Sequence, residues 1–148
     1  MTVAELRARL SMIEPTESMY AGIAPSDVPA LEQLLSDREE WMAARAVFAL
    51  SRVGSREAVD VLSRAAVDQR PSVRVAVAAA VGQRPIALPD TAVIRLLRDE
   101  DVGVRKFATL AVKPENGIEP RSLLNRLASD DAVPVVRENA AEALRKIR

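Results

Sequence analysis

The stretch SVRVAVAAAVG at residues 72–82 returns in altered form further along the chain, as GVRKFATLAV at residues 103–112 and as VVRENAAEALRKI at residues 135–147. In each copy a Val-Arg pair is followed by alanines and larger apolar residues three and four positions apart. That spacing places the apolar side chains on one face of an α-helix. A repeated amphipathic helix is therefore the starting point for the fold.

Other residue types recur at the same interval. One series of aspartates is spaced by 31 residues, at Asp37, Asp68, Asp99 and Asp130. An arginine series follows it at Arg74, Arg105 and Arg137, with Ala43 at the matching position of the first unit; the last step is 32 because SDDAVPVVR carries one extra residue. Self-similarity at an interval of this length predicts a repeat architecture.

Each repeat is predicted to be a helical hairpin, because apolar residues follow helical spacing on both sides of a short polar link. We expect first helices over residues 27–36, 57–67, 90–98 and 120–128, and second helices over residues 40–53, 72–82, 103–112 and 134–147. A separate helix over residues 3–13 is expected to open with a Thr2–Glu5 capping box and to carry Leu6, Leu10 and Ile13 on one face. Residues 14–25 are expected to form a connector.

A hairpin of about 30 residues cannot bury its apolar face alone, so neighbouring units must stack and share one core. The sequence therefore predicts an all-α fold, an α-solenoid of four stacked hairpins. Residues 1–25 are expected to form an N-terminal capping helix and connector, and residues 26–148 the repeat domain. Its units are expected at about residues 26–54, 55–85, 86–116 and 117–148.

The combination of an aspartate, a Val-Arg pair six or seven residues later, and helically spaced Ala and Leu resembles the short HEAT-like repeats of phycobilin-lyase-type proteins. The resemblance covers about residues 26–148. It implies that the aspartates and arginines form a ladder between adjacent repeats, at Asp37, Asp68, Arg74, Asp99, Arg105, Asp130 and Arg137.

Composition excludes most catalytic chemistry. The chain has no His and no Cys, which rules out disulfides, thiolate or imidazole zinc sites, cysteine nucleophiles and a Ser-His-Asp triad. No phosphate-binding glycine motif is present, and the acidic links lack calcium-loop spacing. We therefore expect no catalytic residue, no metal and no cofactor.

Charge and hydropathy narrow the class of partner. Lys plus Arg and Asp plus Glu both number 21, and only 3% of residues are aromatic, so both composition and charge argue against nucleic acid, although some HEAT-like folds act on DNA. The longest apolar stretch, Val75 to Gly82, is far shorter than the ~20 residues of a spanning helix. No signal-peptide pattern opens the sequence, so we expect a cytoplasmic protein that does not enter membranes.

A binding surface is expected on the second helices, which line the concave face of HEAT-like solenoids. If Val73, Val77 and Ala80 are buried, the opposite helix face carries an apolar strip with a basic edge. The residues expected at this surface are Trp41, Arg45, Phe48, Ala79, Lys106, Phe107, Leu110 and Lys113. In the alternative interpretation, curvature or the connector with Met19, Tyr20 and Ile23 buries the strip.

These features favour a non-enzymatic scaffold that binds a protein segment on the concave face. The resemblance implies an alternative, a bilin lyase-like or lyase-accessory role. The C-terminal hairpin, whose end face would lack a stacked neighbour, offers a surface for a partner or for homo-oligomer formation.

Overall fold

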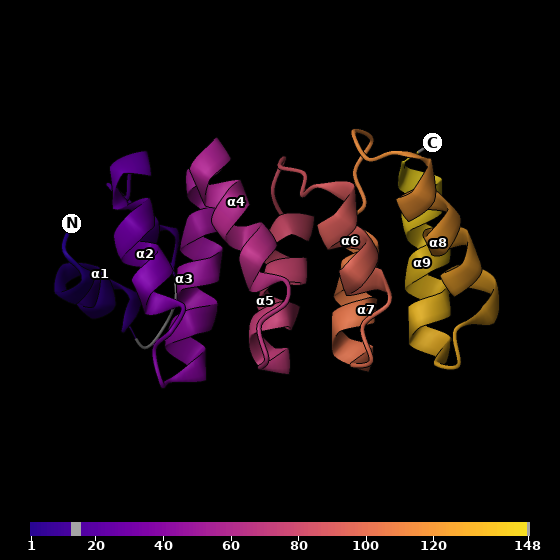
Figure 1. The fold of residues 1–148 in the computed structure, drawn as a ribbon, viewed down its shortest axis with the longest axis horizontal. Helices are drawn as coiled ribbons and strands as arrows, with labels where there is room; N and C mark the ends of the chain where they lie inside the picture. Colours follow the sequence, from indigo (N-terminus) through magenta and orange to yellow (C-terminus); the bar gives the residue numbers. More distant parts are fainter. Residues whose placement is uncertain (13–15, 148) are drawn as a thin grey trace.

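The computed structural model describes residues 1–12 and 16–147, and the regular structure within these ranges is helical. Four hairpins follow one another: α2 (Val28–Leu34) with α3 (Glu40–Val53), α4 (Arg56–Ala65) with α5 (Pro71–Gly82), α6 (Asp90–Leu97) with α7 (Val102–Ala108), and α8 (Ile118–Asp130) with α9 (Pro134–Lys146). Figure 1 shows them side by side in chain order, which confirms the predicted solenoid.

The N-terminal part precedes this stack as α1 (Val3–Leu10) and two 3₁₀ turns, η1 (Glu17–Tyr20) and η2 (Pro25–Asp27). The capping box is present, because the Glu5 amide donates to Thr2 Oγ1 at 3.1 Å and the Thr2 amide donates to a Glu5 carboxylate oxygen at 2.7 Å. The helix ends at Leu10 rather than at residue 13. Ile13 and Glu14 lie outside the described residues.

The local sequence explains where several helices begin. Pro71 and Pro134 open α5 and α9, at positions where a missing amide hydrogen costs little. The side chains of Ser55 and Asp101 cap α4 and α7 by accepting hydrogen bonds from the amides of Ala58 and Val104, at 3.2 and 3.1 Å.

The second helix of the third unit departs from the expected α-helix over residues 103–112. After Ala108 it continues as a 3₁₀ turn, η3 (Thr109–Ala111). The Thr109 hydroxyl donates to the Lys106 carbonyl at 2.8 Å, a local bond of the kind that competes with regular helix geometry. The apolar residues of this unit still reach the core, where Ala108 and Val112 are buried.

The two sides of the stack pack differently. The second helices α3, α5 and α7 contact one another in succession, whereas α4 and α6 make little contact. In Figure 1, α4 crosses obliquely from α3 toward α5. Over the first three hairpins the units therefore lie closer together on the side of the second helices, which is the arrangement expected of a concave face, whereas α6 and α8 are also in contact.

Ion pairs join consecutive units. Arg74 pairs with Asp99 through Nε at 2.7 Å, and it donates to the Asp68 carbonyl at 2.8 Å. Arg105 repeats the arrangement with Asp131 at 2.9 Å and the Asp99 carbonyl at 2.9 Å. One guanidinium thus connects the loop of its own hairpin to the loop of the next, since Arg presents several donors in one plane.

The fourth aspartate of this ladder is Asp131 and not Asp130. Asp130 is exposed and belongs to α8, whereas the side chain of Asp131 is 4% exposed and accepts both bonds from Arg105. The extra residue of the fourth unit lies before the ladder position, because α8 continues through Asp130 and delays the loop by one residue. The structure therefore corrects the expectation that all four aspartates follow the 31-residue interval.

In the first unit Ala43 occupies the position of the ladder arginine, and a different arginine takes over its contacts. Arg70, in the loop before α5, pairs with Asp68 at 3.0 Å and donates to the carbonyls of Asp37 and Leu35 in the preceding unit. Its guanidinium therefore joins Asp68 to the Asp37 loop, as an arginine at position 43 would. The repeat pattern does not single out Arg70, because the equivalent positions in the neighbouring units are Glu39 and Asp101 and no arginine recurs there.

The N-terminal helix extends the ladder by one step. Arg7 of α1 pairs with Asp37 at 3.0 Å, and Leu6 and Leu10 are fully buried. Because α1 supplies both the apolar contacts and the arginine, it covers the first hairpin as a further unit would. At the other end of the stack, Arg137 donates to the Asp131 carbonyl.

Candidate functional site

Apolar side chains gather on the face formed by the second helices. We call this set the inner strip, and it consists of Trp41, Phe48, Val75, Phe107 and Leu110. They come from α3, α5, α7 and η3, so three consecutive units contribute. Trp41 is 45% exposed and Leu110 is 38% exposed, while Phe48, Val75 and Phe107 are half-buried against the core.

Ala79, which we expected in this strip between Phe48 and Leu110, is buried with 9% exposure. The cause is the central position of α5, which packs against α3 on one side and α7 on the other. A methyl group on such a helix is short enough to be covered by its neighbours. This packing also explains why α5 is apolar nearly all round, since most of its residues from Val73 to Val81 are buried.

The structure places two of the expected basic residues in internal contacts. Arg45 donates to the Leu10 carbonyl at 2.6 Å and also to the Met12 carbonyl, and its guanidinium lies 5.3 Å from the centre of the Trp41 ring. Arg45 therefore holds the end of α1, whose last carbonyls lack helical partners. The sequence alone could not show this contact, because it joins segments 35 residues apart.

Lys113 is the second of these. Its ammonium donates to the Arg84 carbonyl at 2.8 Å, and burial lowers its pKa more than the nearby Glu115 raises it. The side chain thus ties together the loops that precede α6 and α8. Of the predicted basic edge, Lys106 has its ammonium 5.3 Å from the centre of the Phe107 ring, beside the inner strip.

The connector covers the far end of α3. Met19 is fully buried, and the guanidinium of Arg52 stacks 3.9 Å above the Tyr20 ring while it pairs with Glu17. The carboxylate of Glu17 accepts this hydrogen bond, which lowers its pKa. The connector thus packs against the C-terminal part of α3 through Arg52, and Trp41 and Leu110 stay exposed.

The described residues contain no group of three His, Cys, Asp or Glu side chains placed to hold a metal ion. None of the helices in the described ranges has the length and apolar character needed to span a bilayer. The side chains that the second-helix face presents can supply apolar contact, a cation beside an aromatic ring and a few hydrogen bonds, which are the ingredients of a binding surface.

Residues 28–92, which span the first two hairpins and the start of α6, match the family model described as HEAT repeats. This segment belongs to the HEAT repeat family. The match confirms the family resemblance, and the observed hairpins confirm the fold class. No curated protein shows a significant match to the chain.

Solved structures extend the likeness of the fold to nearly the whole chain. A chain in the complex of CpcE and CpcF of phycocyanin lyase from Nostoc sp. PCC7120 superposes with a TM-score of 0.70 at 21% identity, covering 95% of this chain and 96% of that one. A designed armadillo repeat protein in complex with the peptide (KR)4 gives a TM-score of 0.57 at 17% identity, covering 99% and 82%. An engineered protein gives 0.59 at 16% identity, covering 99% and 81%. At these identities the likeness shows the fold.

Proposed function

We propose that this HEAT-repeat solenoid is a non-enzymatic scaffold that binds a protein segment on the face of its second helices. The observation that carries the proposal is the inner strip, in which Trp41 and Leu110 remain exposed at opposite ends of a row from three consecutive units. Exposed apolar side chains that form a row on a soluble surface are typical of a contact surface.

The chemistry of the strip supports a protein segment as the ligand. Tryptophan and half-buried aromatic rings are the side chains that most often anchor protein interfaces. Lys106, beside Phe107, adds a cation, and the matching positions on α9 are the acidic residues Glu138 and Glu142. A segment with apolar anchors and charges of both signs at its ends would match this surface. The similar designed armadillo protein holds a peptide, which shows that a stack of this shape can do so.

The test is affinity capture from a lysate of the source cells with the wild-type chain and with Leu110→Asp. The aspartate places a charge in the strip without opening a core cavity, because Leu110 is already 38% exposed. We expect at least one protein to be retained by the wild type and lost with Leu110→Asp. Ile118→Asp, at an exposed apolar position at the start of α8 outside the inner strip, is the matched control and should retain it. Retention that is equal for all three chains would contradict the proposal.

A second candidate is a lyase-like or lyase-accessory role on a bilin chromophore. It is favoured by the nearly complete mutual coverage with a chain of the phycocyanin lyase complex, 95% and 96%. The test is to mix the purified chain with a free bilin and to record the visible spectrum. A shift in absorbance that Trp41→Ala or Phe107→Ala reduces would support this role, and an unchanged spectrum would dismiss it.

A further inference from the structure

The opposite side of the stack, formed by the first helices, has an opening of its own. Because α4 and α6 make little contact, two hollows of about 460 and 440 Å³ lie between them. Both are lined by Val67 and Arg95, so they adjoin along one line. We call this region the outer groove, and it is bounded by Arg64, Val67, Ala92 and Arg95.

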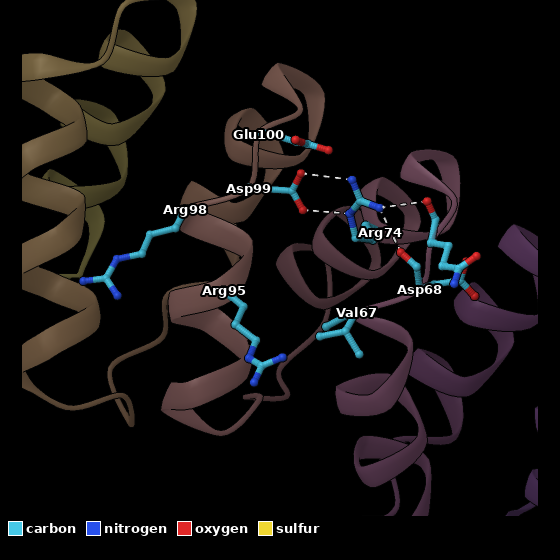
Figure 2. Close-up of a pocket in the computed structure, with 9 residues that line it drawn as sticks. Val67, Asp68, Arg74, Arg95, Arg98, Asp99 and Glu100 are labelled. Atoms are coloured by element: carbon cyan, nitrogen blue, oxygen red, sulfur yellow. Dashed lines mark hydrogen bonds and ion pairs between the residues drawn. The ribbon is translucent and has the colours of Figure 1, made fainter.

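The outer groove has an apolar floor. Val67 is 52% exposed, although it sits between the buried Ala66 and the ladder residue Asp68. At the matching position the third unit has Arg98. In Figure 2 Arg95 extends from α6 toward Val67, whereas Arg98 extends to the other side of that helix. An apolar side chain from a ligand could therefore rest on Val67 with a guanidinium beside it.

Arginines recur along this side at the repeat interval. Arg64, Arg95 and Arg126 are spaced by 31 residues on α4, α6 and α8, and all three are exposed. Within the described ranges neither Arg95 nor Arg126 forms an ion pair. Arg64 contacts Glu32 at 2.8 Å, but both side chains are largely exposed and such pairs exchange easily.

The charges that remain at the groove are mainly positive. Asp68 is paired with Arg70 and Asp99 with Arg74, so their carboxylates are already neutralised by the ladder. Of the charged residues that line the larger hollow, Arg95, Arg98 and Glu100 are left. Among the described residues Arg95 therefore has no ion-pair partner, and Arg64 has only the largely exposed Glu32.

We propose that the outer groove binds an acidic protein segment in extended conformation, with an apolar side chain on Val67 and carboxylates on Arg64 and Arg95. Side chains alternate sides along an extended chain that advances about 3.3 Å per residue, so every fourth residue returns to the same side about 13 Å further on. Because α4 and α6 make little contact, they lie further apart than the about 8–10 Å of packed helices, and carboxylates at every fourth residue would follow Arg64 and Arg95. This surface is separate from the inner strip, so it adds a second binding face to the solenoid.

The probe is a labelled twelve-residue peptide in which Glu occupies every fourth position with Leu and Ser between, and fluorescence anisotropy gives its affinity. We expect binding that weakens with added salt. Relative to the wild type, Arg64→Gln with Arg95→Gln, and separately Val67→Asp, should weaken it about tenfold. The matched control is Arg56→Gln, which removes an equally exposed charge at the start of α4, away from the groove, and should leave the affinity unchanged.

Other outcomes overturn the proposal. The same peptide with Gln in place of Glu should not bind, and equal binding of that peptide would mean that the arginines do not recognise acid. Equal weakening by Arg56→Gln would indicate attraction to overall charge. A single-stranded oligonucleotide that binds more tightly than the peptide, with the same dependence on Arg64 and Arg95, would assign the groove to nucleic acid. Leu110→Asp should leave the peptide affinity intact, so this result stands apart from the test of the inner strip.

Discussion

Arg74 and Asp99, in consecutive hairpins, face each other through two contacts, Nε to Oδ2 at 2.7 Å and Nη2 to Oδ1 at 3.1 Å. Both side chains are mostly buried, with 12% and 9% exposure. The remaining donor of Arg74 bonds to the carbonyls of Asp68 and Gln69. A single side chain thereby fixes two loops that carry no regular structure, which explains how hairpins of this size keep a constant register.

The first prediction concerns the equivalent pair of the next step. Arg105→Ala should lower the free energy of unfolding by about 1–3 kcal/mol, because the buried carboxylate of Asp131 keeps only the Val133 amide as a donor and the Asp99 carbonyl loses the guanidinium. Arg56→Ala, at an exposed position, should cost under about 0.5 kcal/mol. Denaturant midpoints measure both. Equal midpoints for the two variants would mean that the ladder contributes nothing to stability.

The second prediction tests whether Arg70 stands in for the arginine missing at Ala43. Arg70→Ala should destabilise the fold by about 1–3 kcal/mol, since Asp68 loses its guanidinium partner and keeps only the amide of residue 70, and the Asp37 carbonyl loses its side-chain donor. Ala43→Arg added to that variant should restore part of the loss, because position 43 precedes Asp68 by the same 25 residues that separate Arg74 from Asp99. Thermal denaturation of both variants gives the comparison. If the double variant is less stable than Arg70→Ala, then Arg70 does not take the role of the arginine missing at position 43.

The third prediction is a dependence on pH. Hydrogen bonds from the Arg70 side chain hold the pKa of Asp68 below its usual value, and they outweigh the opposing effect of burial. A carboxyl with a depressed folded-state pKa stabilises the fold fully above its unfolded value, about 3.9, and this contribution is lost as the pH falls through the folded value. The stability difference between the wild type and Asp68→Asn should therefore be constant between about pH 7 and pH 5 and should shrink below about pH 4. Urea denaturation at several pH values measures it, and a difference that stays constant under acid conditions would refute the assignment.

The fourth prediction concerns the close approach of α5 and η3. A Cβ atom on Gly82 would lie 2.8 Å from the Leu110 Cβ, so Gly82→Ala forces the two elements apart. We expect a loss of about 1–3 kcal/mol, greater than the gain in helix propensity. Gly103→Ala, where the nearest atoms are 3.0 and 3.5 Å away and belong to side chains, is the control and should cost less. Differential scanning calorimetry of both variants measures the two losses, and a loss for Gly103→Ala as large as that for Gly82→Ala would contradict the prediction.

The fifth prediction separates the inner strip from the core. Val77 is fully buried between neighbouring second helices, so Val77→Ala should cost about 2 kcal/mol. Leu110→Ala should stay within about 1 kcal/mol, because the side chain is already 38% exposed. Chemical denaturation provides both values. If Leu110→Ala proved as costly as Val77→Ala, the strip would be part of the core and would not be free to bind.

The sequence by itself determined the helices and their stacking. The 31-residue interval and the 3.6-residue periodicity are local properties, and they placed α3 at residues 40–53 with the same bounds that the structure has. They also singled out Arg74 and Arg105, because both begin a second helix at a constant distance from the loop aspartate. Exposure of Leu110 followed from helix geometry in the same way.

Tertiary structure alone decided which partners these residues meet. Asp131 replaces Asp130 because α8 runs one residue longer, Arg70 fills the place left by Ala43, and Arg45 turns back to the end of α1. Ala79 is covered because its neighbours on both sides close over a side chain as short as a methyl group. Each of these outcomes depends on the path of a loop or on the reach of a long side chain across units. Such distances are set by the packing of the whole stack and leave no periodic signal in the sequence.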